Sequence, residues 1–249
     1  MQDLLVKVKE FKKIIDHSQK IVFFGGAGVS VPSGIPDFRS ADGVYSKATN
    51  TIYSAEEMVS RTMYFRDTEF FNDFYFKHLV YPNALPNPCH TYLARLEEEG
   101  KLKAVVTQNI DGLHQAAGSK VVYELHGSVH RNYCIKCRTF HDLKATLEAP
   151  RGKCKTCGGY LKPDVVLFEE GLDHNTIMSS VEAISKADTL IIGGTSLVVQ
   201  PAASLVNYFK GKNIVVINKT DISVPTYLNP NVLFIKADIG KTFQLLNEL

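Results

Sequence analysis

The chain has 249 residues, of which 45% are hydrophobic and 22% charged, and its formal net charge is +2. This composition is that of an ordinary globular protein, long enough to bury a full core in one large domain or two modest ones. The small net charge comes without any Lys- or Arg-rich run, so a nucleic-acid partner has little electrostatic support.

In chain order, short apolar runs alternate with segments of helical spacing. Leu4, Val8 and Phe11 predict a first helix, and Leu93 and Leu96 predict a later one. Buried strands are predicted at Ile21–Phe24, Ala104–Thr107, Val121–Leu125, Val165–Phe168, Thr189–Ile192, Asn213–Asn218 and Val232–Ile235. Apolar strands alternating with helices are typical of a parallel sheet covered on both faces. We therefore predict a doubly wound α/β domain, which binds ligands at the carboxyl ends of its strands.

Two stretches interrupt this alternation and are predicted to be insertions. Residues 38–88 are aromatic-rich and helical in character, whereas residues 128–162 are polar and contain four paired cysteines. Residues 1–37, 89–127 and 163–249 then form the α/β domain. The two insertions could together form a smaller second lobe.

The paired cysteines predict a structural zinc site. Cys134-x-x-Cys137 and Cys154-x-x-Cys157 are separated by sixteen residues, and a two-residue gap lets both thiolates face one metal ion. Surface thiols or a redox pair would explain one such motif, but two at zinc-ribbon spacing favour one Zn²⁺. Four sulfur ligands leave no open coordination position, so we expect no chemistry at the metal.

Because the four cysteines complete the zinc site, His130 and His141 are expected at the surface and not as ligands. The fifth cysteine, Cys89, is expected to be a small buried apolar residue.

Three features of the sequence indicate the cellular compartment. Apolar runs such as Ile21–Phe24 are far shorter than the roughly 18 residues of a membrane-spanning helix. The first residues lack the apolar core of a signal peptide, and thiolate ligands suit a reducing compartment. We expect a cytoplasmic monomer with no membrane partner.

A glycine-rich turn follows the first predicted strand. Gly26-x-Gly28 would let backbone amides approach a pyrophosphate, but Val31 stands where a dinucleotide fingerprint has its third glycine. No ribose-binding acid is obvious about 20 residues further on. Alone, this turn fits a structural bend as well as a nucleotide site.

Polar clusters follow four of the predicted strands, at residues 33–39, 107–114, 126–127 and 194–196. Strand ends of an open α/β sheet share one crevice, so these clusters are expected to converge. Amide, acid and hydroxyl groups around one imidazole suit a charged ligand and a proton transfer. Each cluster alone could equally be a loop cap or a solvated turn.

Taken together, these stretches resemble the sirtuin family of NAD-dependent protein lysine deacylases, in its bacterial form. The match covers residues 26–39, 107–114, 126–127, the zinc cysteines, 163–166 and 194–199, in the family's order. This resemblance implies a Rossmann-like doubly wound parallel sheet, with a smaller lobe made of a helical module and a zinc ribbon.

The resemblance also implies the reaction and its residues. NAD is a co-substrate that loses nicotinamide, and the acyl group of a protein or peptide lysine is transferred to ADP-ribose. His126 resembles the general base, while Asn109 and Asp111 would orient the ribose and the nicotinamide carboxamide. The acyl-lysine would thread a tunnel near Val166 and Phe168. The implied cofactor contacts are Ala27, Val31, Phe38, Arg39, Gln108, Ile110, Asp111, His126, Thr195, Ser196, Asn218, Asp238 and Ile239.

Three positions depart from the family pattern. Gly25 replaces a common Thr or Ser, and Glu169 replaces a common Gly at the edge where the substrate peptide is expected. Glu169 could therefore alter sequence preference. Tyr75-x-x-His78 stands where members preferring acidic acyl groups have Tyr-x-x-Arg, which argues against a succinyl-type preference unless Lys77 or His78 takes the place of that arginine.

Two other functions remain open. A sirtuin-type mono-ADP-ribosyltransferase often lacks the Asn or the His of this pattern, whereas Asn109 and His126 are both present here. A non-enzymatic NAD-sensing or scaffold protein would need no general base, and His126 would then be a core or capping residue.

Overall fold

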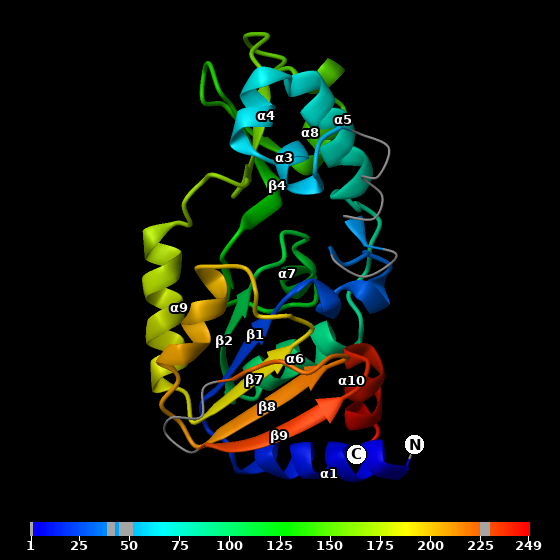
Figure 1. The fold of residues 1–249 in the computed structure, drawn as a ribbon, viewed down its shortest axis with the longest axis vertical. Helices are drawn as coiled ribbons and strands as arrows, with labels where there is room; N and C mark the ends of the chain where they lie inside the picture. The colour runs from blue at the N-terminus through cyan, green and yellow to red at the C-terminus, as the bar shows by residue number, and fades with distance from the viewer. Residues whose placement is uncertain (1, 39–42, 45–51, 225–229) are drawn as a thin grey trace.

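The computed structural model describes residues 2–38, 43–44, 52–224 and 230–249, which form two lobes stacked along the long axis of the molecule (Figure 1). The larger lobe contains a parallel sheet of six strands, and the smaller one contains an antiparallel sheet of three strands. The predicted fold class is thereby confirmed. Arg39, a predicted cofactor contact, lies outside the described residues.

The six-stranded sheet has the order β3-β2-β1-β7-β8-β9, and its neighbours pair in parallel. Its strands are β1 (Ile21–Gly25), β2 (Leu102–Thr107), β3 (Val122–Glu124), β7 (Thr189–Gly193), β8 (Asn213–Asn218) and β9 (Asn231–Lys236). This is the strand order of Rossmann domains. The order reverses between β1 and β7, so loops leaving these two strands diverge there and leave room for a ligand.

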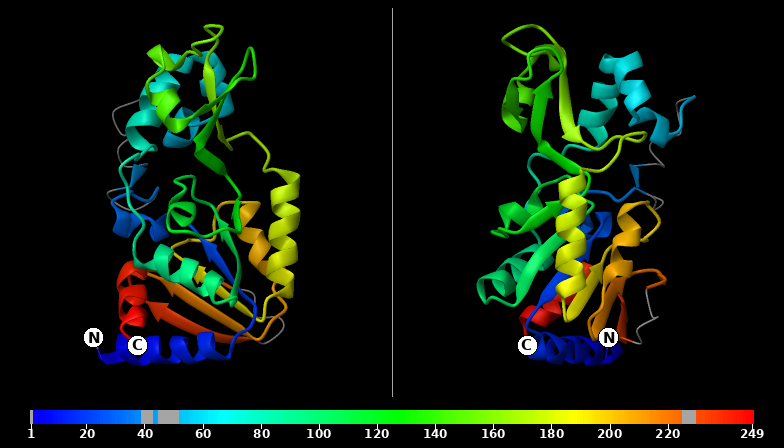
Figure 2. Two further views of the ribbon diagram at one scale, coloured as in Figure 1. Left: turned by 180° about the vertical axis from the view of Figure 1, so that it is seen from behind. Right: turned by 90° about the vertical axis from the view of Figure 1, so that its left-hand side faces the viewer.

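Helices cover both faces of this sheet (Figures 1 and 2). One face carries α1 (Gln2–His17), α6 (Pro88–Glu98) and α10 (Ile239–Asn247), and the other carries α9 (His174–Lys186) and the 3₁₀ helix η4 (Ala202–Tyr208). Val8, Phe11 and Ile15 are spaced for one helical stripe, and all three are buried. Phe11 meets Phe243 of α10 edge to face, at 5.9 Å between ring centroids. Cys89 is fully buried in the same core, as predicted.

The smaller lobe combines both insertions. Its sheet has the order β5-β4-β6, with β4 (Gly127–Cys134), β5 (Phe140–Asp142) and β6 (Leu161–Val165). Its helices are α3 (Ala55–Met58), α4 (Arg61–Arg66), α5 (Thr68–His78), α8 (Leu143–Leu147) and the 3₁₀ helix η3 (Pro150–Gly152). Tyr64, Phe71 and Tyr75 of the helical module share one core cluster with Val129 and Leu143 of the cysteine-containing insertion. Because side chains of both insertions are buried in this one cluster, the two insertions pack as a single unit.

One predicted strand was placed in the wrong sheet. The apolar run Val165–Phe168 does not join the large sheet; strand β6 ends at Val165 and pairs antiparallel with β4. An apolar run indicates burial but not the partner strand, which depends on contacts distant in sequence. The predicted boundary between residues 162 and 163 falls inside β6, and the division into domains otherwise stays a prediction.

Among the described helices, none is both long and apolar enough to cross a membrane.

Candidate active site and zinc centre

The glycine-rich turn after β1 crosses the turn after β7 at the point where the strand order reverses. The amide of Gly28 donates to the carbonyl of Gly194 at 2.8 Å. Gly194 has φ +57°, and a Cβ atom built on it would lie 2.4 Å from the nitrogen of Val29. Only glycine fits such a backbone contact. The crossing places the half-buried Ala27 and Val31 at the switch point of the sheet, where Rossmann folds bind dinucleotides.

Three polar side chains form a hydrogen-bonded chain beside this crossing. The Ser30 hydroxyl donates to Asp111 Oδ2 at 2.6 Å and accepts from Asn109 Nδ2 at 3.0 Å. Asn109 and Asp111 follow β2, whereas Ser30 follows β1, so adjacent strands bring them together. Ser30 was missed as a site residue. Its position directly after the glycine-rich turn was the available signal.

Asp111 is largely enclosed by its neighbours. Burial raises the pKa of the Asp111 carboxyl, while hydrogen bonds from Ser30 and from the Leu113 amide oppose that rise. The negative charge of Glu124 also raises this pKa, and His130 lowers it. Since hydrogen-bond donors meet both of its oxygens, the carboxyl has a fixed orientation in the crevice.

His126 lies between β3 and β4, and its backbone carbonyl accepts from the amide of Val166 at 3.0 Å. Its Nδ1 lies 2.9 Å from the carbonyl oxygen of Gln108. A carbonyl oxygen only accepts, so Nδ1 carries the hydrogen and Nε2 is the basic nitrogen. Burial lowers the pKa of His126 below 6.5, with the Gln108 hydrogen bond opposing. Burial thus favours the neutral imidazole, which is the form that can act as a base.

Other predicted cofactor contacts follow β2 and β7 or pack against the smaller lobe. Gln108 Nε2 donates to Thr195 Oγ1 at 3.1 Å, which links the loops after β2 and β7. Ile110 packs against the core of the smaller lobe, and Phe38 packs against a neighbouring apolar cluster of the helical module. Ser196 is exposed beside Thr195. The structure thus gathers these residues, and their individual roles stay predictions.

The predicted cofactor contacts Asn218, Asp238 and Ile239 lie near the ends of β8 and β9. Asn218 ends β8 and donates to the carbonyl of Thr220 at 2.9 Å. Asp238 caps α10, and its carboxylate lies 3.0 Å from Lys219 Nζ. Ile239, the first residue of α10, is buried. These side chains share the carboxyl edge of the sheet with the crossing turns.

The four predicted metal ligands converge in the smaller lobe. Their sulfur atoms all lie within 4.8 Å of one another, with Cys134 and Cys157 3.4 Å apart and Cys137 and Cys154 3.8 Å apart. Four sulfurs on a tetrahedral zinc ion lie about 3.8 Å apart, given a Zn–S bond of about 2.3 Å. The cluster therefore fits one zinc ion with no position left for a substrate.

The expectations for the two neighbouring histidines had different outcomes. His130 is exposed as predicted, and its Nε2 lies 2.9 Å from the carbonyl oxygen of Asp111. The surface prediction for His141 is wrong, because its side chain is buried. His141 is the middle residue of β5, whose side chains alternate, so it points inward between exposed Phe140 and Asp142.

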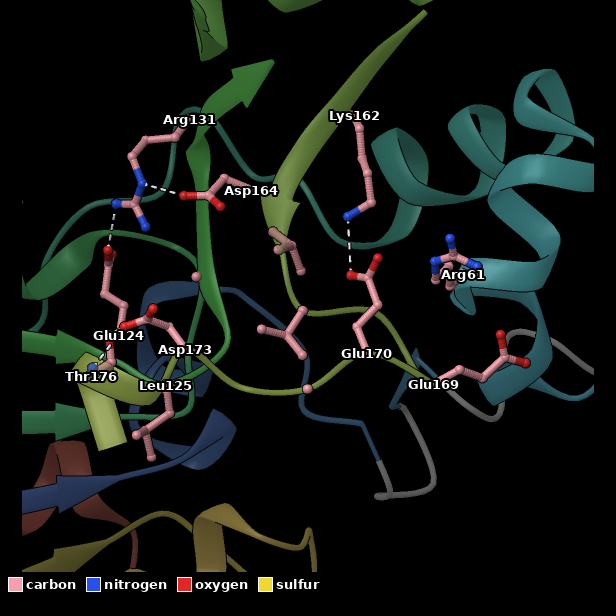
Figure 3. A pocket seen from close by; sticks show the side chains of 14 residues that line it. Arg61, Glu124, Leu125, Arg131, Lys162, Asp164, Glu169, Glu170, Asp173 and Thr176 are labelled. Atoms are coloured by element: carbon pink, nitrogen blue, oxygen red, sulfur yellow. Dashed lines mark hydrogen bonds and ion pairs between the residues drawn. The ribbon is translucent and has the colours of Figure 1, made fainter. Parts of the chain in front are cut away.

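A polar pocket of about 650 Å³ adjoins the site on the side of α9 (Figure 3). Leu125, Gly127 and Val166 line it, and the first two flank His126 in the sequence. Its charged walls come from α4, β3, β4, β6 and the loop before α9. The predicted substrate residue Val166 thus lines this pocket while its amide binds the His126 carbonyl, and Phe168 is 37% exposed nearby in sequence.

These features place the chain in a class of α/β proteins. Its members bind a nucleotide at the switch point of a Rossmann-type sheet, and this one has a second lobe with a zinc ribbon. Comparison with known proteins specifies the class further. The model of the Sir2 family matches residues 26–201. The chain belongs to the Sir2 family.

Relatives and solved structures agree with this assignment. The chain is 58% identical to an NAD-dependent protein deacetylase of Clostridium perfringens, over 94% of this chain and 96% of the relative. It is 44% identical to one of Staphylococcus aureus, strain NCTC 8325, over 85% and 87%. A Sir2 structure with a deacetylated p53 peptide and 3′-O-acetyl ADP ribose has a TM-score of 0.84 and 34% identity, covering 97% of both chains.

Proposed function

We propose that this chain is an NAD-dependent protein lysine deacetylase, which transfers the acyl group of a lysine side chain to ADP-ribose. One observation carries the proposal: Nδ1 of His126 is fixed on the carbonyl of Gln108, so Nε2 is available as a base. Gln108 directly precedes Asn109 of the Asn109–Ser30–Asp111 chain. Family membership and curated relatives described as NAD-dependent protein deacetylases agree with it.

The residues of the crevice have distinct tasks. When bound, NAD supplies an electrophilic ribose carbon and nicotinamide as the leaving group. Asn109 and Asp111 orient the ribose and the carboxamide, and Ser30 holds both of them in place. Nε2 of His126 accepts a proton from a ribose hydroxyl, which makes that oxygen a better nucleophile. Phe38 and Ile110 are apolar and keep water from the reacting carbon.

The acylated substrate is proposed to add as an extended strand at the junction of the two lobes. Phe168 and Val198 are apolar residues that stay 37% and 60% exposed on the two loops expected to flank the peptide. Exposed apolar groups suit the aliphatic stem of an acyl-lysine. The remaining predicted NAD contacts, a monomeric state and a cytoplasmic location belong to the same proposal.

A panel of acyl-lysine peptides tests this function. The purified protein is incubated with NAD and each peptide, while nicotinamide, deacylated peptide and O-acyl-ADP-ribose are quantified together. Deacetylation predicts that the three products appear in equal amounts. ADP-ribosylated peptide in place of deacylated peptide would favour a mono-ADP-ribosyltransferase. Absence of any NAD cleavage by the zinc-loaded protein would refute both enzymatic functions.

A further inference from the structure

Glu169 has an unusual backbone conformation in the loop that follows β6. Its φ is +75°, in the left-handed region where glycine is favoured and other residues are strained. This chain has a glutamate in that conformation, at the position where the family pattern commonly has glycine. The strain implies that the carboxylate makes a compensating contact.

That contact is with the helical module. Glu169 Oε2 accepts from the backbone nitrogen of Thr62 at 2.9 Å and from its hydroxyl at 2.7 Å. Thr62 is the second residue of α4. The backbone runs parallel beside it: the Arg61 amide donates to the Phe168 carbonyl at 3.0 Å, and the Phe168 amide donates to the Val59 carbonyl at 3.2 Å.

The side chain of the next residue, Glu170, is bound on the other side of the loop. Glu170 Oε2 lies 3.0 Å from Lys162 Nζ of β6 and accepts from the Leu167 amide at 3.0 Å. Figure 3 shows Glu170 turned toward Lys162, and Glu169 on the side of Arg61 and α4. Consecutive carboxylates therefore attach the loop to both halves of the smaller lobe.

The attached loop is also hydrogen-bonded to the backbone of His126, the proposed base. At its other end the Val166 amide donates to the His126 carbonyl at 3.0 Å, so residues 166–169 extend from His126 to α4. The two residues proposed to contact the acyl-lysine, Val166 and Phe168, lie within this segment. A shift of the segment at Glu169 would displace the acyl-lysine relative to Nε2 of His126.

We propose that Glu169 is a positioning residue for the acyl-lysine, which fixes the Val166–Phe168 segment by binding Thr62 and does not read the peptide sequence. This inference rests on the proposed deacetylase function, because that function places the acyl-lysine on the segment. It replaces the expectation that Glu169 tunes sequence preference, since its carboxylate is engaged by the protein itself.

The experiment compares Glu169→Ala, Glu169→Gln, Thr62→Val and the double variant Glu169→Ala/Thr62→Val with wild type. For acetyl-lysine peptides, Kd is measured by fluorescence anisotropy, and KM and kcat by nicotinamide release. We expect Glu169→Ala to raise Kd and KM for the peptide about fivefold, with kcat and KM for NAD within twofold. Glu169→Gln keeps an acceptor oxygen and should recover most of the affinity. Glu98→Ala, an exposed carboxylate of α6, is the matched control.

The double variant identifies the contact. Thr62→Val loses one of two donors and should raise Kd about twofold. The double variant should bind the peptide no more weakly than Glu169→Ala alone. An unchanged peptide Kd in a folded Glu169→Ala protein would overturn the proposal. The proposal would also be overturned if the change in peptide Kd caused by Glu169→Ala depended on the charge of the residues flanking the acyl-lysine, while Thr62→Val left Kd unchanged. Because Kd needs no turnover, an inactive wild type would count against the proposed function alone.

Discussion

The two ring nitrogens of His126 have different roles: Nδ1 fixes the ring, and Nε2 accepts the proton. Nδ1 is bound to the Gln108 carbonyl, so replacing the ring removes the base together with one hydrogen bond to the backbone. We expect His126→Ala to lower kcat at least ~100-fold, with zinc content and Tm close to wild type. His17→Ala removes an exposed imidazole at the end of α1 and is the control. Wild-type turnover by folded His126→Ala would refute the assignment of the base.

The acid side of the pH profile tests the same residue. Burial lowers the pKa of His126 below 6.5, and the base works only when neutral. We expect kcat/KM to fall as pH drops through an apparent pKa below 6.5, measured from pH 5 to 9 with zinc retained. The folded state also binds this proton more weakly than the unfolded state, so stability is lost in the same direction. An acid limb centred above 6.5 would contradict the burial effect.

Among the elements, the two cysteine turns hold the ribbon together. Cys134 and Cys137 lie at the end of β4, and Cys154 and Cys157 precede β6, so one metal ion closes the sheet. We expect Cys154→Ser to reduce zinc from one equivalent toward none and to lower Tm by several degrees. Cys89→Ala, in the core of the other lobe, should keep one equivalent. Full zinc occupancy in Cys154→Ser, measured by atomic absorption, would exclude the four-sulfur site.

The same elements show what the sequence could predict. Apolar runs identified the six strands of the large sheet, because buried parallel strands are apolar on both faces. The partner of β6 was not readable from its run, since pairing with β4 depends on the fold of the whole insertion. The role of Ser30 was missed for a similar reason. Its hydroxyl gains a function only because β1 and β2 are neighbours, which brings Asn109 and Asp111 to it.

At the scale of the whole molecule, one arginine joins the two lobes beside the active site. Arg131 of β4 donates from Nη1 to Glu124 of β3 at 2.7 Å and from Nε to Asp164 of β6 at 2.7 Å. Glu124 belongs to the large sheet, and its side chain is only 9% exposed. It precedes His126 by two residues, and its charge raises the pKa of Asp111. Arg131 therefore neutralises the nearly buried charge of Glu124, which is close to His126 in sequence and acts on Asp111.

Removing that arginine should affect stability and catalysis together. In Arg131→Ala, Glu124 stays nearly buried without its cation, so we expect the free energy of unfolding to fall by about 1–3 kcal/mol. We also expect kcat/KM for NAD to fall several-fold, because the turn that carries His126 loses its tie to β4. Arg95→Ala, which breaks an exposed pair with Glu99 at 3.7 Å, should change stability by less than about 0.5 kcal/mol. Urea unfolding and NAD kinetics measure both effects, and equal behaviour of the two variants would show that Arg131 does not couple the lobes.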